Sequence, residues 1–195
     1  MNSNFCICIA IFIFFKIAIS IPPFNDTDVF AHDIGFIAIS DASGDLLGFN
    51  VSIGGGLGAT RHGLTKAYPR LGDIIGFCSR ADTSWVAQKI MEVQRDHGYR
   101  SDRTHARLKY TVEDHGVEFF VSEINRRMSQ DEDCRHLYPR GFSLQAALPF
   151  EFKDNKDTFG ETVNSDGTHN FSIYMQNGRI KNFDEGFYTV SDGDG

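Results

Sequence analysis

Three cationic side chains lie close together in the segment RTHARLK and could form a binding site for an anion. They are Arg103, Arg107 and Lys109. The pattern predicts a helix from about Asp102 to Tyr110, on which Arg103 and Arg107 share a face because residues four apart are neighbours on a helix. Guanidinium groups in this arrangement can hold a carboxylate or a phosphate bidentately. The alternative is a solvated helix face, on which each cation pairs weakly with a nearby Asp or Glu.

A run of three glycines, Gly54, Gly55 and Gly56, is the second candidate for an anion site. Glycine allows backbone N–H groups to approach a ligand closely and to form a concave nest around it. His62 follows within reach. The alternative is a plain turn at the end of a strand. The spacing also matches the G-x-G-x-x-A of nucleotide-binding loops, but such a loop needs a helix directly after it, and the glycines and proline between residues 58 and 72 oppose one.

The overall charge indicates that any cationic site is local. The chain has 195 residues, 41% of them hydrophobic, and a formal net charge of −7. This composition predicts one folded domain, or one domain and part of another. The acidic balance argues against binding of nucleic acid or of an anionic membrane surface. Two basic clusters in an acidic protein therefore favour a small anionic ligand.

The cysteines show no metal-site spacing. Cys6, Cys8, Cys78 and Cys134 contain no C-x-x-C pair, so no residue is assigned as a metal ligand. Scattered cysteines are typical of the reduced thiols of a cytoplasmic protein. The sequence also lacks H-E-x-x-H and G-x-S-x-G, which excludes two common kinds of hydrolase motif.

The apolar N-terminal stretch permits two interpretations. Residues 5–15 resemble the core of a signal peptide, but no Lys or Arg precedes them. The run is shorter than the ~18 apolar residues of a membrane-spanning helix, so no membrane segment is predicted. The competing interpretation is a buried β-strand over residues 15–21, which Pro22 and Pro23 end.

The hydrophobic pattern predicts an α/β fold, with a mixed sheet and helices packed on it. A β-hairpin is expected around the turn sequence DASGD, because β-rich runs flank it on both sides. The predicted strands are 35–40, 46–53 and 73–78, and the predicted helices after them are 83–98 and 117–128.

The composition changes at residue 129. Residues 129–149 are rich in charge and contain two prolines, which predicts a linker. Residues 170–180 then predict a β-hairpin with an Asn-Gly turn. Because two strands alone are only marginally stable in water, we interpret this region as part of a second domain cut within its fold.

Several longer segments together resemble one enzyme family. They are IPPFNDTDVFAHDIGFIAI, GFNVSIGGGLGATRHG, YPRLGDIIGF and QRDHGYRSDRTHARLKYTVEDHGVEFF. These segments are similar to the siroheme-containing sulfite reductases, most of all to the hemoprotein component of the NADPH-dependent type. The likeness covers residues 15–183. Alternatives are the related ferredoxin-nitrite reductases and a secreted or anchored module that binds a small anion.

The resemblance implies a six-electron reduction of sulfite to sulfide at siroheme, which is coupled to a 4Fe–4S cluster and receives electrons from a flavoprotein partner. It further implies that Gly54, Gly55, Gly56 and His62 lie beside siroheme. By the same resemblance, Arg103, Arg107 and Lys109 face the carboxylates of siroheme. The implied domains are a non-family extension over 1–14, a siroheme-binding domain over 15–128, the linker over 129–149 and the truncated start of a second, ferredoxin-like half-domain over 150–195.

Two departures from the family pattern limit what the chain can do alone. Where the family has Arg-Lys-Phe-Lys with two substrate lysines, this chain has Ile13-Phe14-Phe15-Lys16. The resemblance therefore assigns a catalytic role to Lys16 only. The cluster cysteines of the family, in C-x5-C and C-x3-C spacings, have no match here. We therefore expect the chain by itself to bind no cluster and to have little or no activity.

Overall fold

The computed structural model describes residues 15–59, 67–101, 105–131, 143 and 146–175. The chain divides into two units, one ending at Lys156 and the other starting at Asp157, and each is described by itself.

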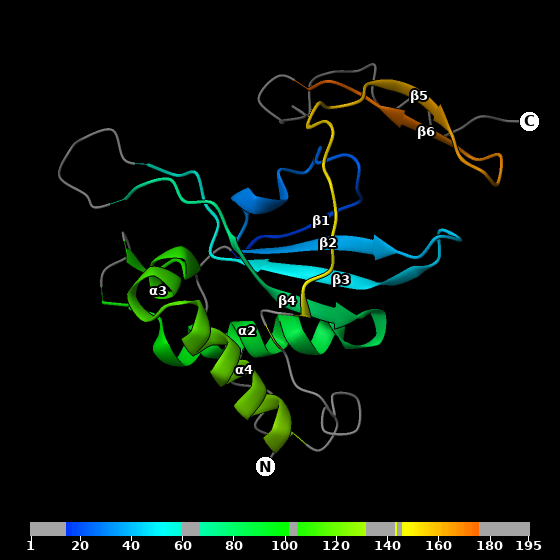
Figure 1. Ribbon diagram of the computed structural model, residues 1–195. Helices are drawn as coiled ribbons and strands as arrows, with labels where there is room; N and C mark the ends of the chain where they lie inside the picture. Colours follow the sequence, from blue (N-terminus) through cyan, green and yellow to red (C-terminus); the bar gives the residue numbers. More distant parts are fainter. Residues whose placement is uncertain (1–14, 60–66, 102–104, 132–142, 144–145, 176–195) are drawn as a thin grey trace, which may run out of the picture. The chain divides into compact units, whose positions relative to one another are not determined.

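A four-stranded mixed sheet forms the centre of the first unit (Figure 1). Its strands are β1 (Ile17–Ser20), β2 (Ile34–Ser40), β3 (Leu46–Ile53) and β4 (Asp73–Ser79), in that order across the sheet. β1 runs parallel to β2, and the other neighbours are antiparallel. The predicted mixed sheet is therefore confirmed, as is the strand within residues 15–21 that competed with the signal peptide.

The predicted hairpin between β2 and β3 is closed by an aspartate. The Asp41 side chain accepts hydrogen bonds from the backbone N–H groups of Ser43 and Asp45, at 2.8 and 3.0 Å. Aspartate favours turns because its side chain can satisfy N–H groups two to four residues onward. Gly44 has a φ of 91°, a conformation that glycine adopts without a steric penalty. The turn chemistry thus fixes the pairing of Ile39 with Gly48.

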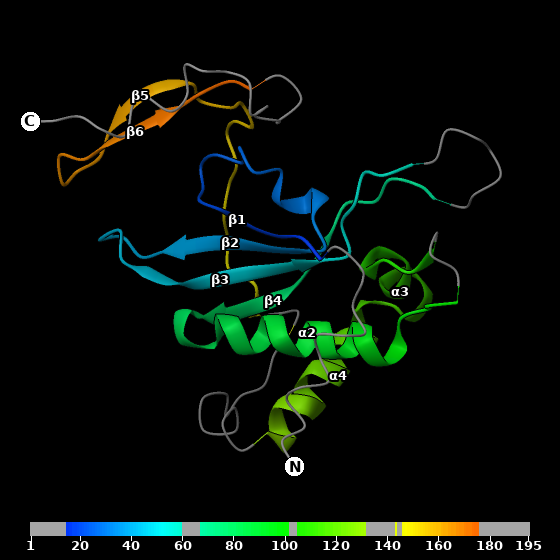
Figure 2. The ribbon, with the colours of Figure 1, turned by 180° about the vertical axis from the view of Figure 1, so that it is seen from behind.

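Three helices pack on one face of this sheet: α2 (Thr83–His97), α3 (Leu108–His115) and α4 (Val117–Gln130) (Figures 1 and 2). Short 3-10 turns, η2 (Val29–Ala31) and η3 (Arg80–Asp82), precede β2 and α2. In α4 the side chains of Phe120, Ile124 and Met128 face the core at helical spacing. The helices predicted over 83–98 and 117–128 are confirmed.

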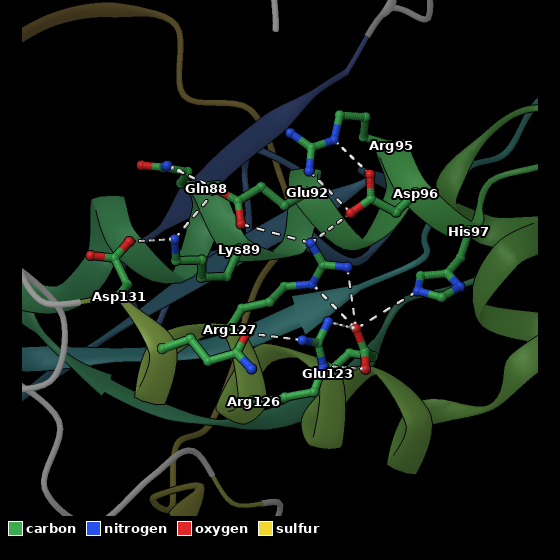
Figure 3. A network of polar contacts seen from close by, with 11 residues as sticks. Gln88, Lys89, Glu92, Arg95, Asp96, His97, Glu123, Arg126, Arg127 and Asp131 are labelled. Carbon is green, nitrogen blue, oxygen red and sulfur yellow. Dashed lines mark hydrogen bonds and ion pairs between the residues drawn. The ribbon is translucent and has the colours of Figure 1, made fainter. Parts of the chain in front are cut away.

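Helices α2 and α4 are also joined by a network of ion pairs (Figure 3). The Arg127 guanidinium lies 2.7 Å from Asp96 of α2 and 3.2 Å from Glu123 of its own helix. Hydrogen bonds from Arg95 and then Arg127 lower the pKa of Asp96 to about 2, although burial by itself would raise it. Hydrogen bonds from Arg126 and then Arg127 likewise lower the pKa of Glu123 to about 2. These carboxylates therefore stay charged in mildly acidic solution.

The segment 146–154 crosses the other face of the sheet as an extended strap (Figure 1). The Asn50 side chain of β3 is fully buried. It donates to the carbonyl of Leu148 at 2.7 Å and accepts from the Leu148 N–H at 2.9 Å. Phe152 packs edge-to-face on Phe30. Part of the region predicted as a linker, together with residues after it, is therefore packed on the first unit, and α4 extends to Gln130.

In the described residues of the second unit, β5 (Gly160–Val163) and β6 (His169–Ser172) form a hairpin. The second strand predicted for the hairpin over residues 170–180 lies outside the described residues, but the first strand is present and includes Phe171. The strand pairs with β5, which comes before it, across a turn at residues 164–168. The Asn177-Gly178 turn lies outside the described residues. In the part of the chain that is described, no helix has the length and apolar character needed to span a bilayer.

Candidate anion-binding site

The basic segment enters α3 differently from the prediction. Arg107 is extended, with φ −74° and ψ 155°, and α3 begins one residue later at Leu108. The predicted helix over 102–110 is therefore wrong at its start, and Arg107 does not project from a helix face. Arg103 lies outside the described residues. The extended conformation directs Arg107 toward β2 and the glycine loop, where its contacts are long-range.

Asp33, just before β2, anchors the Arg107 guanidinium. Both carboxylate oxygens accept from Nη2 of Arg107 at 3.0 Å, and the Asp33 side chain is completely buried. The guanidinium also lies against the backbone of Gly56, where a Cβ would meet Nη1 at 2.9 Å and Cζ at 3.1 Å. Nε of Arg107 is buried and has no hydrogen-bond partner within the part of the chain that the structure describes. A buried donor without a partner is costly, so this nitrogen is a site where an anionic ligand would be stabilised.

The glycine loop does not form the predicted nest of free N–H groups. Gly54 N–H donates to Asp33 O at 2.9 Å, Gly55 N–H to His32 O at 3.0 Å and Gly56 N–H to Arg70 O at 2.8 Å. All three donors are thus already used within the protein. The glycines serve close approach instead: a Cβ on Gly55 would lie 2.7 Å from His32 O. Gly54 also has a φ of 79°. The loop therefore contributes a surface against which Arg107 packs.

Lys109, in the first turn of α3, is used as a clamp on the same loop. Its side chain is 1% exposed, and Nζ donates to the carbonyls of Gly56, Gly58 and Tyr68 at 3.2, 2.9 and 2.5 Å. The ammonium also lies 5.0 Å from the ring centre of Tyr110, a favourable cation–π distance. Burial, followed by the Arg107 charge, lowers the pKa of Lys109 from its ordinary value. Three carbonyls occupy the three donors of an ammonium, so the Lys109 clamp is saturated.

Arg70 is a second clamp, which follows the glycine loop in the sequence but was not among the predicted site residues. It donates to the Gly54 carbonyl at 3.1 Å and forms ion pairs with Asp73 at 2.5 Å and Glu113 at 2.9 Å. The side chain thus joins the glycine loop to β4 and α3. The sequence signal was weak, because an arginine beside a proline in a loop has many possible partners. Asp33 was missed as well, although a carboxylate at the edge of an apolar strand is a recognisable sign of a buried partner.

Lys16 is exposed at the start of β1, and its backbone rather than its side chain is fixed. The Lys16 N–H donates to Asp33 Oδ2 at 3.0 Å, and its carbonyl accepts from Ile34 N–H at 3.1 Å. The structure therefore brings Lys16, Gly56, Arg107 and Lys109 to one region around Asp33. His62 lies outside the described residues, so its predicted place in the site stays a prediction.

The chain matches a family model described as the nitrite and sulphite reductase 4Fe-4S domain, over residues 14–132. It is similar to the sulfite reductase (NADPH) hemoprotein beta-component of Myxococcus xanthus, with 45% identity over 85% of this chain and 27% of the relative. The protein with the same description from Geobacillus kaustophilus is 46% identical over 88% of this chain and 27% of the relative. The chain thus spans about a quarter of the length of these relatives.

A solved structure supports the same fold. The Mycobacterium tuberculosis NirA protein matches with a TM-score of 0.56 and 22% sequence identity, covering 74% of this chain and 23% of that chain. The family model covers more than half of the sequence, which establishes the family, and the likeness to the solved structure agrees with the fold. The chain belongs to the nitrite and sulphite reductase 4Fe-4S domain family.

Proposed function

We propose that this chain is part of the hemoprotein component of an assimilatory sulfite reductase and that Arg107 holds a carboxylate of siroheme. The observation that carries the proposal is the buried Nε of Arg107, which has no hydrogen-bond partner among the described residues, in a guanidinium fixed by Asp33 and Gly56. Such a preorganised cation suits the carboxylates of a tetrapyrrole. The 43–46% identity to named hemoproteins over most of the chain adds support.

Bound siroheme would supply the iron at which sulfite, a small oxyanion, is reduced to sulfide, with electrons reaching it from a flavoprotein that oxidises NADPH. The chain's own residues would bind and orient. Arg107 would neutralise a siroheme carboxylate, and Lys16 would present an exposed ammonium that attracts sulfite and can donate a proton. In this proposal Lys109 and Gly54–Gly56 shape the site without contacting the anion directly. A cytoplasmic location is part of the proposal.

The described residues do not fit an iron–sulfur cluster. Within these ranges, no group of three or more His, Cys, Asp or Glu side chains could hold a metal ion. Cys78 is buried in the core, and burial raises the pKa of its thiol to about 12, so it does not supply a thiolate ligand. We therefore propose that the chain alone holds no cluster and does not reduce sulfite. Cluster absorbance after reconstitution of the isolated chain with iron and sulfide would contradict this.

A chimera tests the function directly. Residues 15–175 of this chain replace the aligned part of the Myxococcus xanthus hemoprotein, and siroheme content and sulfite reduction with a chemical electron donor are measured. We expect the chimera to retain siroheme and to form sulfide. The Arg107→Gln chimera should lose most of its siroheme, whereas Arg80→Gln, at an exposed position, should not. A folded chimera without siroheme or sulfide formation would refute the proposal, and a faster reaction with nitrite than with sulfite would favour the nitrite branch.

A further inference from the structure

The carboxylate of Asp33 is the point at which two cationic site residues meet. It accepts hydrogen bonds from Arg107 Nη2 through both oxygens and from the backbone N–H of Lys16 through Oδ2, all at 3.0 Å. The side chain is completely buried, whereas the Arg107 side chain is 29% exposed. One buried anion therefore connects a cation that reaches toward solvent with the start of an edge strand.

The backbone around Asp33 is held just as firmly. Its carbonyl accepts from Gly54 N–H at 2.9 Å, and the next residue, Ile34, donates to the Lys16 carbonyl at 3.1 Å. Asp33 thus contacts the glycine loop through its main chain, and Lys16 and Arg107 through its side chain. Moving any one of these three segments would break a hydrogen bond to the same residue.

We propose that Asp33 is a positioning residue that fixes the Arg107 guanidinium, relative to Lys16, in the orientation that receives an anionic ligand. This inference rests on the proposed function, because siroheme is the ligand in question. With Nη2 tied to Asp33 and the flat face against Gly56, Nε remains a buried donor that has no partner among the described residues. Asp33 therefore selects which edge of Arg107 a siroheme carboxylate meets.

If Asp33 acted through its charge alone, its removal would strengthen siroheme binding, whereas a positioning role predicts weaker binding. Asp33 is a negative group beside an anion site, so removing its charge would strengthen the attraction of the site for an anion. Positioning predicts weaker binding, because a guanidinium without its anchor must be ordered again when the ligand binds. A purely structural role predicts lower stability with unchanged affinity. The sign of the change in affinity therefore separates the three roles.

The experiment compares three single variants of the full chain: Asp33→Asn, Arg107→Gln and Asp96→Asn. Asp96→Asn is the matched control, because Asp96 also pairs with an arginine, Arg127, but outside the site. Siroheme affinity is measured by absorbance titration, and folding by circular dichroism. We expect Asp33→Asn to weaken siroheme binding at least about tenfold and the control to leave it unchanged. Unchanged or tighter binding in folded Asp33→Asn would overturn the proposal.

A double variant tests whether Asp33 acts through Arg107. When two residues share one interaction, their effects are not additive. We therefore expect Asp33→Asn to have little further effect on siroheme affinity in the Arg107→Gln background. Two independent effects that multiply would show that Asp33 does not act through Arg107, and the proposal would fall.

A ligand-free measurement keeps the inference separate from the proposed function. In NMR spectra of the wild-type chain we expect slowly exchanging, separately resolved Nη protons for Arg107, assigned by their loss in Arg107→Gln. The exposed Arg80 should give averaged signals. Averaged Arg107 signals in the wild type would overturn the positioning role even if Asp33→Asn does not fold. If siroheme fails to bind but the Arg107 signals are resolved, the proposed function fails while the anchoring of Arg107 by Asp33 stands.

Discussion

Replacing Gly55 with alanine should separate the glycine loop from its neighbours, whereas the same change at Gly58 should not. A Cβ on Gly55 would lie 2.7 Å from His32 O, 2.9 Å from His32 N and closer still to Phe30 O. These are all backbone atoms, and ordinary contacts begin at 3.4 Å. The loop and the η2 region must therefore move apart. A Cβ on Gly58 would meet no atom of the described residues within 4 Å, so Gly58 is the matched control.

The cost can be estimated from the contacts that separation disturbs. The Gly55 N–H bond to His32 O, at 3.0 Å, and the Gly72 N–H bond to Phe30 O, at 2.8 Å, share the atoms that the methyl group displaces. Each hydrogen bond contributes ~0.5–1.5 kcal/mol, and forced overpacking costs ~1–3 kcal/mol. Gly55→Ala should therefore lower the free energy of unfolding by about 2–6 kcal/mol. Gly58→Ala should raise the free energy of unfolding by no more than about 1 kcal/mol, because alanine lowers the conformational entropy of the unfolded chain.

Urea unfolding followed by Trp85 fluorescence measures both changes. Trp85 is the one tryptophan of the chain and packs against the core of the first unit. A domain is typically stable by about 5–15 kcal/mol, so Gly55→Ala should shift the midpoint strongly or abolish the transition. Equal midpoints for the two variants would refute the reasoning that Gly55 is required for close backbone approach.

Three further predictions concern the scaffold of the first unit. First, the pKa values of Asp96 and Glu123 are lowered from 3.8 and 4.5 to about 2, so their ion pairs should stabilise the fold above about pH 4.5 and lose this effect as the pH falls toward 2. The urea midpoint of Glu123→Gln should therefore depend less on pH between these values than that of the exposed control Glu118→Gln. Equal pH dependence of the two midpoints would contradict this prediction. Phe120→Ala, at a fully buried position, should cost about 3–5 kcal/mol in the free energy of unfolding, and a loss below about 1 kcal/mol would argue against the helix–sheet core. Asn50→Ala should leave both polar backbone groups of Leu148 unpaired and speed hydrogen exchange at its amide, which the exposed Asn155→Ala should not do.

Elements with a local pattern were predictable from the sequence. The hairpin around Asp41 and Gly44 has turn chemistry that acts within five residues, and helix α4 has buried side chains at helical spacing. The start of α3 was not predictable in this way. Arg107 is extended, and its guanidinium pairs with Asp33, 74 positions away, so a tertiary contact accompanies the departure from the helical pattern.

The candidate site shows the same division between local and tertiary information. Glycine composition predicted close approach of the loop to a ligand, whereas in the structure the loop approaches other backbone of the chain, and its N–H groups bind carbonyls of His32, Asp33 and Arg70. Likewise, the charge of Lys109 is plain in the sequence, while its three carbonyl partners come from a loop more than 40 positions away. The strand at Phe171 pairs with a segment before it, and the prediction, which was based on the Asn-Gly turn signal downstream, did not include this pairing.

Titration of the full chain with siroheme is the most direct test of the account. Hydrogen bonds to charged groups contribute ~1.5–3 kcal/mol, and each 1.4 kcal/mol is about tenfold in affinity. We therefore predict saturable binding by the wild-type chain and by Arg80→Gln, and binding weaker by about tenfold or more for Arg107→Gln. Equal dissociation constants for all three proteins would contradict the claim that Arg107 holds the anionic cofactor.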